Sequence, residues 1–186
     1  MKRITLIAST FIIILPHTSS FAAPDSSAHK QEAMSIVKKF AGSLKPELKK
    51  AIKTGGPAHA VSVCADLAPT IAEKLRTDTG WYIKRVSLKA RNPSAQPDAW
   101  EQKVLEQFDQ RQAKGEEAQK MAYSEVVDGR FRFMKAQGVE KVCLKCHATK
   151  INPEVETALN EKYPHDKARG YTLGQIRGAF SLAKDF

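Results

Sequence analysis

The stretch MAYSEVVDGRFRFMKA, residues 121–136, holds two β-rich segments on either side of Asp128-Gly129. An Asp-Gly pair between two such segments is a strong signal for a tight turn joining antiparallel strands. The stretch therefore predicts a β-hairpin with strands at 121–127 and 130–136. It also makes an antiparallel sheet the expected centre of the fold.

Two further segments are predicted to be strands. Residues 81–89 alternate in polarity and are rich in β-formers, and residues 175–186 alternate in the same way. Between the first of these segments and the hairpin lie a loop at 91–97 and a short helix that starts at Asp98. A further helix is expected at about 153–162.

The chain before these strands is helical by pattern. Apolar residues recur at spacings of three and four over residues 26–54 and again over residues 57–79. Gly55-Gly56 separates the two helices, Gly80 is a natural stop, and Pro46 is expected to kink or restart the first helix. Two helices followed by antiparallel strands predict an α+β fold, with a single domain at residues 23–186.

The first residues have the pattern of a secretory signal peptide. Lys2 and Arg3 precede the apolar run of residues 4–15, and small residues favour cleavage after Ala22. The alternative is a membrane anchor, but twelve helical residues span only about 18 Å of a core about 30 Å thick. We therefore expect residues 1–22 to be removed and the domain to be soluble in the periplasm, with no stable membrane span.

The chain is basic. Its 186 residues carry a formal charge of +10, and loss of Lys2 and Arg3 with the signal peptide lowers this to about +8. Export argues against nucleic acid as a partner. A solvated, lysine-rich surface is the simpler interpretation, and a basic face that attracts an acidic redox or signalling protein, or an anionic membrane surface, is the alternative.

Residues 143–147, CLKCH, match the C-x-x-C-H pattern of covalent c-type haem attachment. In this chemistry two thiols, here Cys143 and Cys146, add across the two vinyl groups of one haem. The adjacent His147 then binds the iron from the proximal side. Such attachment takes place outside the cytoplasm, so the signal peptide independently favours the same interpretation.

Three other interpretations of these residues compete with haem. A redox C-x-x-C normally sits in a thioredoxin-like βαβ unit, whereas this motif follows a predicted hairpin. A zinc site could combine Cys143, Cys146 and His147 with a distant ligand such as Cys64. A disulfide between Cys143 and Cys146 would close a tight ring, and the third cysteine would still be unpaired. The pattern favours haem over all three.

The second axial ligand of such a haem decides its chemistry. The candidates in the sequence are Cys64, His59, His165, Met34, Met121 and Met134. His59 and Cys64 lie five residues apart, about 140° around a helix, so both cannot face one haem. Cys64 lies on the apolar side of its predicted helix, where a small buried hydrophobe is the alternative role.

Three blocks carry a family resemblance: AVSVCADLAPTIA at 60–72, RVSLKARNP at 85–93, and PDAWE at 97–101. Together with the downstream CLKCH, they resemble the PAS-like c-type haem domain with His/Cys axial ligation, long a domain of unknown function and also the sensory part of some histidine kinases. The resemblance spans nearly all of the mature chain. It implies a PAS-like antiparallel sheet behind N-terminal helices, with Cys64 as the distal iron ligand.

Haem propionates need cationic or hydrogen-bonding partners. The candidates near the Arg-Asn-Pro turn are Arg91, Arg85, Tyr82 and Asn92, with Lys89 beside them. The alternative is that these residues are a turn and its surface charges.

The expected function is that of an exported mono-haem protein that senses redox state or a small gas and is not an enzyme. With both His147 and Cys64 bound, the iron is six-coordinate, and release of Cys64 on reduction would open a site. The alternative is a small periplasmic electron-transfer cytochrome. A zinc-binding module fits the sequence less well. A haem enzyme fits poorly too, because it needs an open distal site with acid-base residues.

Overall fold

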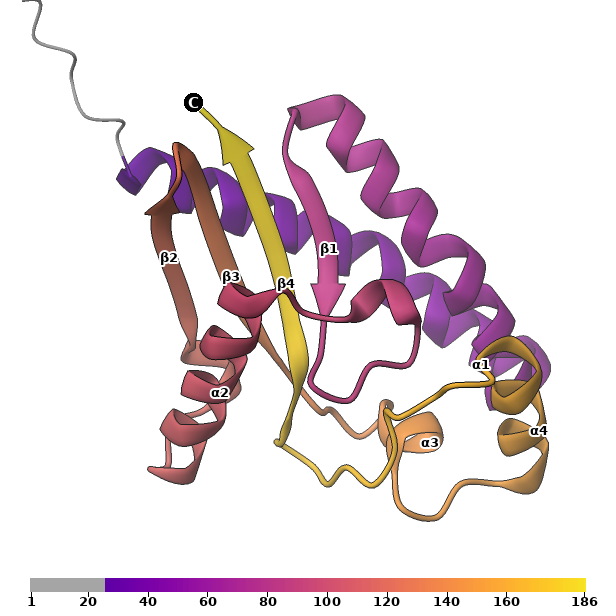
Figure 1. Ribbon diagram of the computed structural model, residues 1–186. Coiled ribbons are helices and arrows are strands. Elements are labelled where there is room, and N and C mark those ends of the chain that lie inside the picture. Colours follow the sequence, from indigo (N-terminus) through magenta and orange to yellow (C-terminus); the bar gives the residue numbers. More distant parts are fainter. Residues whose placement is uncertain (1–25) are drawn as a thin grey trace, which may run out of the picture.

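The computed structural model describes residues 26–186 (Figure 1). The predicted signal peptide and its cleavage site lie outside the described residues. No helix within residues 26–186 is long and apolar enough to span a membrane. The elements run in the order α1 (Ser26–Thr79), β1 (Tyr82–Val86), η1 (Pro93–Ala95), α2 (Ala99–Ala113), η2 (Ala118–Lys120), β2 (Ala122–Val127), β3 (Arg130–Gly138), α3 (Leu144–His147), α4 (Pro153–Lys162) and β4 (Ile176–Asp185).

The strands form one four-stranded antiparallel sheet in the order β1-β4-β3-β2. β2 and β3 form the predicted hairpin, and Asp128 and Gly129 between them have φ values of 51° and 74°. Positive φ at both central positions matches the twist of the flanking strands, and Asp-Gly tolerates it. The hairpin and the α+β fold are therefore confirmed.

α1 consists of two helical arms that meet at Gly56, where φ is 76° and ψ is 176°. This is the break predicted at Gly55-Gly56. The helix continues through Pro46 with helical dihedral angles, so the expected restart there is wrong. The second arm ends at Gly80, which has φ of 73° and donates its N–H to the carbonyl oxygen of Arg76 at 2.8 Å. Glycine reaches this left-handed conformation without a steric penalty.

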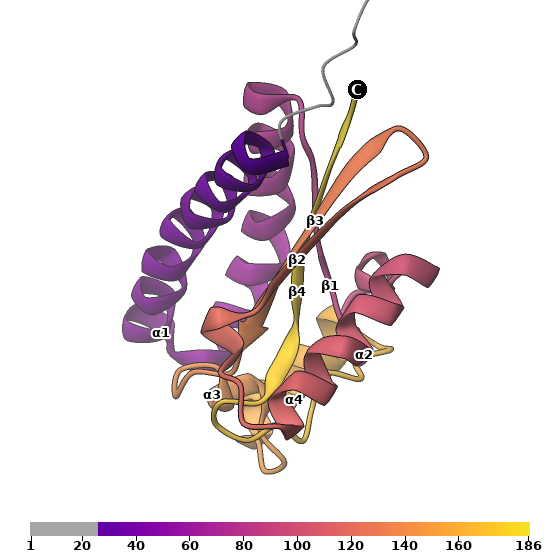
Figure 2. The same cartoon turned by 90° about the vertical axis from the view of Figure 1, so that its left-hand side faces the viewer.

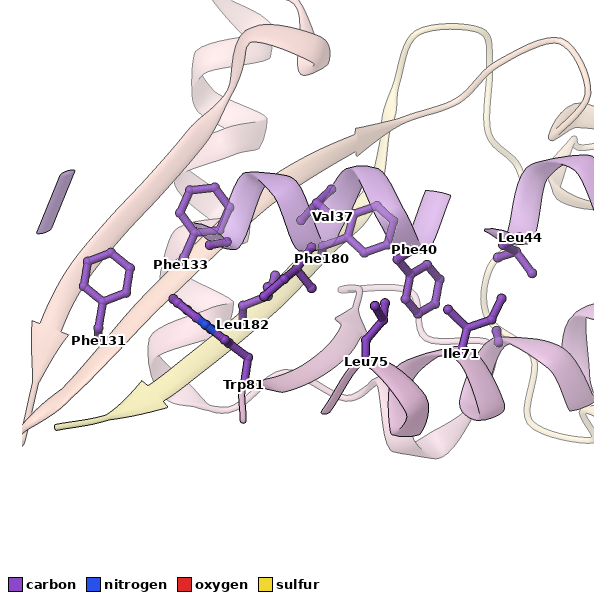
Figure 3. Close-up of a cluster of buried hydrophobic side chains, with 13 residues drawn as sticks. Val37, Phe40, Leu44, Ile71, Leu75, Trp81, Phe131, Phe133, Phe180 and Leu182 are labelled. Atoms are coloured by element: carbon purple, nitrogen blue, oxygen red, sulfur yellow. The ribbon is translucent and has the colours of Figure 1, made fainter. Parts of the chain in front are cut away.

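Both arms of α1 cover one face of the sheet, and α2 covers the other (Figure 2). The main core lies under α1, where Phe40, Ile71 and Leu75 pack against Trp81 and the inward side chains of β3 and β4 (Figure 3). The strand alternation decides which residues enter this core: Phe131 and Phe133 point toward α1.

The intervening residues of the same strands point toward α2. Met134 and Ala136 of β3 pack with Val104, Leu105 and Phe108 of α2 in a second buried cluster. α2 itself starts at a capping box, in which Asp98 and Glu101 each accept a hydrogen bond from the other's backbone N–H. The short α3 and α4 lie together at one end of the sheet, near the bend of α1 (Figure 1).

Candidate functional site

A cavity of about 600 Å³ lies between α1, the sheet and α3. Its apolar wall comes from both arms of α1, including Leu44, Leu48 and Val61. Its polar and sulfur-bearing side chains come from segments far apart in the sequence. A volume of this size suits an organic ligand or cofactor.

Cys146 and His147 of α3 line the cavity together with Cys143, the residue before this helix. Cys143 precedes this single helical turn, and its carbonyl oxygen accepts the N–H of Cys146 at 3.1 Å and of His147 at 3.0 Å. The turn thus brings all three side chains to one side of the cavity. All three cysteines of the chain are free thiols, so no disulfide joins Cys143 to Cys146.

The imidazole of His147 is held in one orientation. Its Nδ1 lies 2.7 Å from the carbonyl oxygen of Ala168, and because a carbonyl only accepts, Nδ1 carries the proton. Burial, followed by the positive charges of Arg177 and Arg91, lowers the pKa of His147 to about 2. Nε2 therefore carries a lone pair rather than a proton, the arrangement of a metal-binding histidine whose other nitrogen is anchored by a carbonyl.

Arg91 holds the segment around this motif in place. Its guanidinium donates to the carbonyl oxygen of Cys146 at 2.6 Å and to that of Ala168 at 3.4 Å. It also pairs with Asp166, whose side chain is only 1% exposed, at 3.1 Å. Nε and Nη2 of Arg91 are thus engaged by Asp166 and by the two carbonyl groups, and they hold Cys146 and the Ala168 carbonyl in position.

Of the six candidates for a second axial ligand, Cys64 alone lines the cavity. Met34 packs on the core under α1, and Met121 and Met134 are fully buried on the α2 face of the sheet. His165 is exposed, and His59 lies against Gly55 at the bend of α1. Burial raises the pKa of the Cys64 thiol, although Arg85, Arg177 and Arg91 act in the opposite direction.

The zinc interpretation needs three or four of these ligands close together. Within residues 26–186, no group of three or more His, Cys, Asp or Glu side chains is gathered closely enough to hold a metal ion. Cys64 and the α3 residues share a cavity without forming such a group. The geometry is that of donors placed around a larger ligand.

Of the other residues predicted to contact the haem propionates, Arg85 and Asn92 line the cavity and Tyr82 does not. Arg85 faces the cavity, and its guanidinium lies 5.7 Å from the centre of the Phe40 ring. Asn92 lines the cavity as well, but its side chain caps η1 by accepting the N–H of Ser94. The prediction that Tyr82 belongs to the site is wrong. Its side chain is 49% exposed, lies under Arg130, and does not line the cavity. It is three residues from Arg85 on one strand, so the two side chains point to opposite faces.

Two functional residues were missed in the sequence. Arg177 of β4 lines the cavity with its Nη1 3.5 Å from Nε2 of His147. Asp166 pairs with both Arg91 and Arg169 and accepts the N–H of Ala168. The signal for Arg177 was a charged residue at the start of the predicted strand, beside the apolar residues 176 and 178–180. Nothing in the sequence indicated the role of Asp166.

Comparison with known proteins identifies the family. The model of the Tll0287-like family matches residues 19–184. The chain belongs to the Tll0287-like family. Among solved structures, the cyanobacterial heme-protein Tll0287 matches with a TM-score of 0.68 and 23% identity, over 88% of this chain and 97% of that one. This likeness shows that the two share a fold.

The Tll0287-like match confirms the family resemblance drawn from the three sequence blocks and CLKCH. No curated protein matches the chain. The ligation of an iron by His147 and Cys64 stays a prediction, as does the covalent attachment at Cys143 and Cys146.

Proposed function

We propose that this protein binds one haem covalently through Cys143 and Cys146, with His147 and Cys64 as its axial ligands. The observation that carries the proposal is that Cys64 of α1 lines the same cavity as the three functional side chains of the CLKCH segment. These residues are about eighty positions apart in the chain. The solved relative is a haem protein, which supports the same assignment.

The residues around the cavity fit this cofactor. Each thiol S–H of Cys143 and Cys146 adds across one vinyl C=C bond, with sulfur going to one carbon and hydrogen to the other, so no further reactant is needed. His147 offers Nε2 as an iron ligand, with its tautomer fixed by the Ala168 carbonyl. The buried Nε of Arg177 has no hydrogen-bond partner within residues 26–186, so the site holds an unused donor for an anionic group.

Bound haem supplies a one-electron couple and, where an axial position opens, a binding site for a small gas. A thiolate from Cys64 would stabilise the ferric state and keep the reduction potential low. Loss of the Cys64 bond on reduction, when the thiolate takes up a proton, would open that position. We therefore propose non-catalytic redox or small-gas sensing in the periplasm, after removal of the signal peptide.

The second candidate function is electron transfer to an acidic protein. It is favoured by the exposed lysines of the first arm of α1, which include Lys38, Lys39, Lys49, Lys50 and Lys53. Such a basic face raises the rate of encounter with an acidic partner, and the effect falls with salt. A sensor requires Cys64 to leave the iron, whereas an electron carrier requires it to stay.

The test is an absorption spectrum of the full chain, expressed with its leader in cells that attach haem c, in both oxidation states. Wild type is expected to keep its haem through acid-acetone extraction, and Cys64→Ala is expected to keep the haem but change the oxidised spectrum. His59→Ala is the control, because His59 does not line the cavity. Absence of covalent haem would overturn the proposal, and an unchanged Cys64→Ala spectrum would overturn the ligand assignment.

Carbon monoxide separates the two functions. Binding of CO to the reduced protein with displacement of Cys64 favours the sensor. A reduced protein that does not bind CO and exchanges electrons reversibly favours the electron-transfer function. A protein that contains zinc and shows no Soret band would instead support the zinc-binding module.

A further inference from the structure

Two arginines in the cavity differ from every other arginine among residues 26–186. Arg85 of β1 and Arg177 of β4 form no ion pair with any carboxylate in this part of the chain. Each of the other arginines pairs with an Asp or Glu, namely Arg76, Arg91, Arg111, Arg130, Arg132 and Arg169. The exceptions are thus both at the cavity.

These two cations are placed where they are least favourable without an anion. β1 and β4 are neighbouring strands, and both guanidiniums line one cavity. Both side chains are half-buried in the cavity wall. The Nε of Arg177 is buried and makes no hydrogen bond. A charge that is partly removed from water without an opposite charge beside it is unfavourable, so a site of this kind favours a negatively charged ligand.

Arg91 also lines the cavity, but unlike Arg85 and Arg177 it has a carboxylate partner. Its charge is balanced by Asp166, and its Nη2 donates to two backbone carbonyl groups. The nearby Lys89 is turned toward the carbonyl oxygen of Arg169 and the ring of Tyr171. The two unpaired charges are therefore those of Arg85 and Arg177.

We infer that Arg85 and Arg177 together form a site for two carboxylates, which receives the propionates of the haem. The inference rests on the proposed function, since it names the partners of that same cofactor. Two guanidiniums match two propionates in charge, and the planar fork of arginine suits a carboxylate. Arg177 would then act as a positioning residue that fixes how the cofactor lies beside His147.

The test uses the haem-loaded protein and the variants Arg85→Gln and Arg177→Gln. Arg130→Gln is the matched control, because it removes the same charge at the exposed Arg130–Asp185 pair outside the cavity. The readout is the pair of propionate bending bands in the resonance Raman spectrum, which respond to hydrogen bonding at the carboxylates. Each cavity variant is expected to keep its covalent haem and to shift these bands, while Arg130→Gln leaves them in place.

Arg85→Lys and Arg177→Lys extend the test. They keep the charge but lack the fork, so they are expected to shift the same bands by less than the glutamine variants do. They also carry the measurement if a glutamine variant fails to fold. Bands that stay unchanged in all cavity variants, with haem still attached, would overturn the carboxylate site and leave the proposed function standing. Wild type without covalent haem would overturn both.

Discussion

Arg91 donates a hydrogen bond at 2.6 Å to the carbonyl oxygen of Cys146, which lies 55 residues further along the chain. The same guanidinium holds Asp166, and the Ala168 carbonyl nearby accepts from His147. One side chain thus connects the loop after β1 to the CLKCH segment and to the segment that orients the imidazole. The motif alone does not fix its own geometry, since a residue from a distant loop does part of this.

Replacing Arg91 should therefore loosen the site. Arg91→Ala leaves the buried Asp166 with Arg169 as its remaining ion-pair partner, and the Cys146 carbonyl oxygen loses its hydrogen bond from Arg91. We expect the free energy of unfolding to fall by about 2–3 kcal/mol, because buried polar groups lose their partners. Urea denaturation measures this fall. Arg76→Ala, at an exposed pair within α1, should leave stability almost unchanged, and equal losses in both variants would contradict the role given to Arg91.

Loss of the two thiols of the CLKCH segment should abolish covalent haem attachment, whereas loss of the Cys64 thiol should not. The double variant Cys143→Ser/Cys146→Ser should carry no covalent haem, because the CLKCH segment then has no sulfur that could form a thioether. Cys64→Ser should keep its covalent haem. Acid-acetone extraction followed by a pyridine haemochrome spectrum distinguishes the two. Haem lost from Cys64→Ser at the extraction step would show that the attachment is assigned to the wrong cysteines.

Exchanging the distal ligand should move the reduction potential in a known direction. Cys64→Met replaces an anionic thiolate by a neutral thioether, and a thioether favours ferrous iron relative to a thiolate. The potential of Cys64→Met should therefore lie well above that of wild type in a spectroelectrochemical titration. His59→Met serves as the control, since His59 lies outside the cavity. A potential that rises equally in both variants would speak against Cys64 as the ligand.

The sequence was a good guide where one local rule decides the structure. Asp128-Gly129 and Gly56 each require a backbone that few residues adopt, so the hairpin and the bend of α1 were predictable. The restart expected at Pro46 was wrong, because the helix continues through that residue.

The site was less predictable, because it depends on which strand residues share a face. Tyr82 and Arg85 both looked suited to the cavity, but the alternation of β1 sends them to opposite faces. Arg177 was not predicted, although it is a charged residue between Ile176 and the apolar residues that follow in β4. Cys64 was found through the family resemblance, since its helix pattern alone fits a buried hydrophobe equally well.

The buried carboxylate of Glu101 should be important for stability on the other face of the sheet. Its side chain is 1% exposed, accepts from the backbone N–H of Asp98 and from Ser181 Oγ, and pairs with Lys84 at 2.8 Å. Arg132 lies 3.4 Å from the same carboxylate, so Glu101→Ala removes the acceptor for all four donors, and we expect a loss of about 3–5 kcal/mol in the free energy of unfolding. Glu106→Ala on the exposed side of α2 should cost about 0.5 kcal/mol or less. Similar losses in both variants would contradict this assignment.

Replacing glycine by alanine should change the stability of the protein in opposite directions at Gly178 and at Gly42. A Cβ on Gly178 would lie 2.2 Å from the carbonyl oxygen of Val86, and its φ of 155° is one that other residues rarely adopt. Gly178→Ala must push β4 away from β1, beside both Arg85 and Arg177, and we expect it to cost about 3 kcal/mol. Gly42 lies on the exposed side of α1 with open space around it, so Gly42→Ala should gain about 0.5–1 kcal/mol. Urea denaturation of both variants tests the pair, and a Gly178→Ala protein as stable as wild type would show that β1 and β4 do not approach this closely.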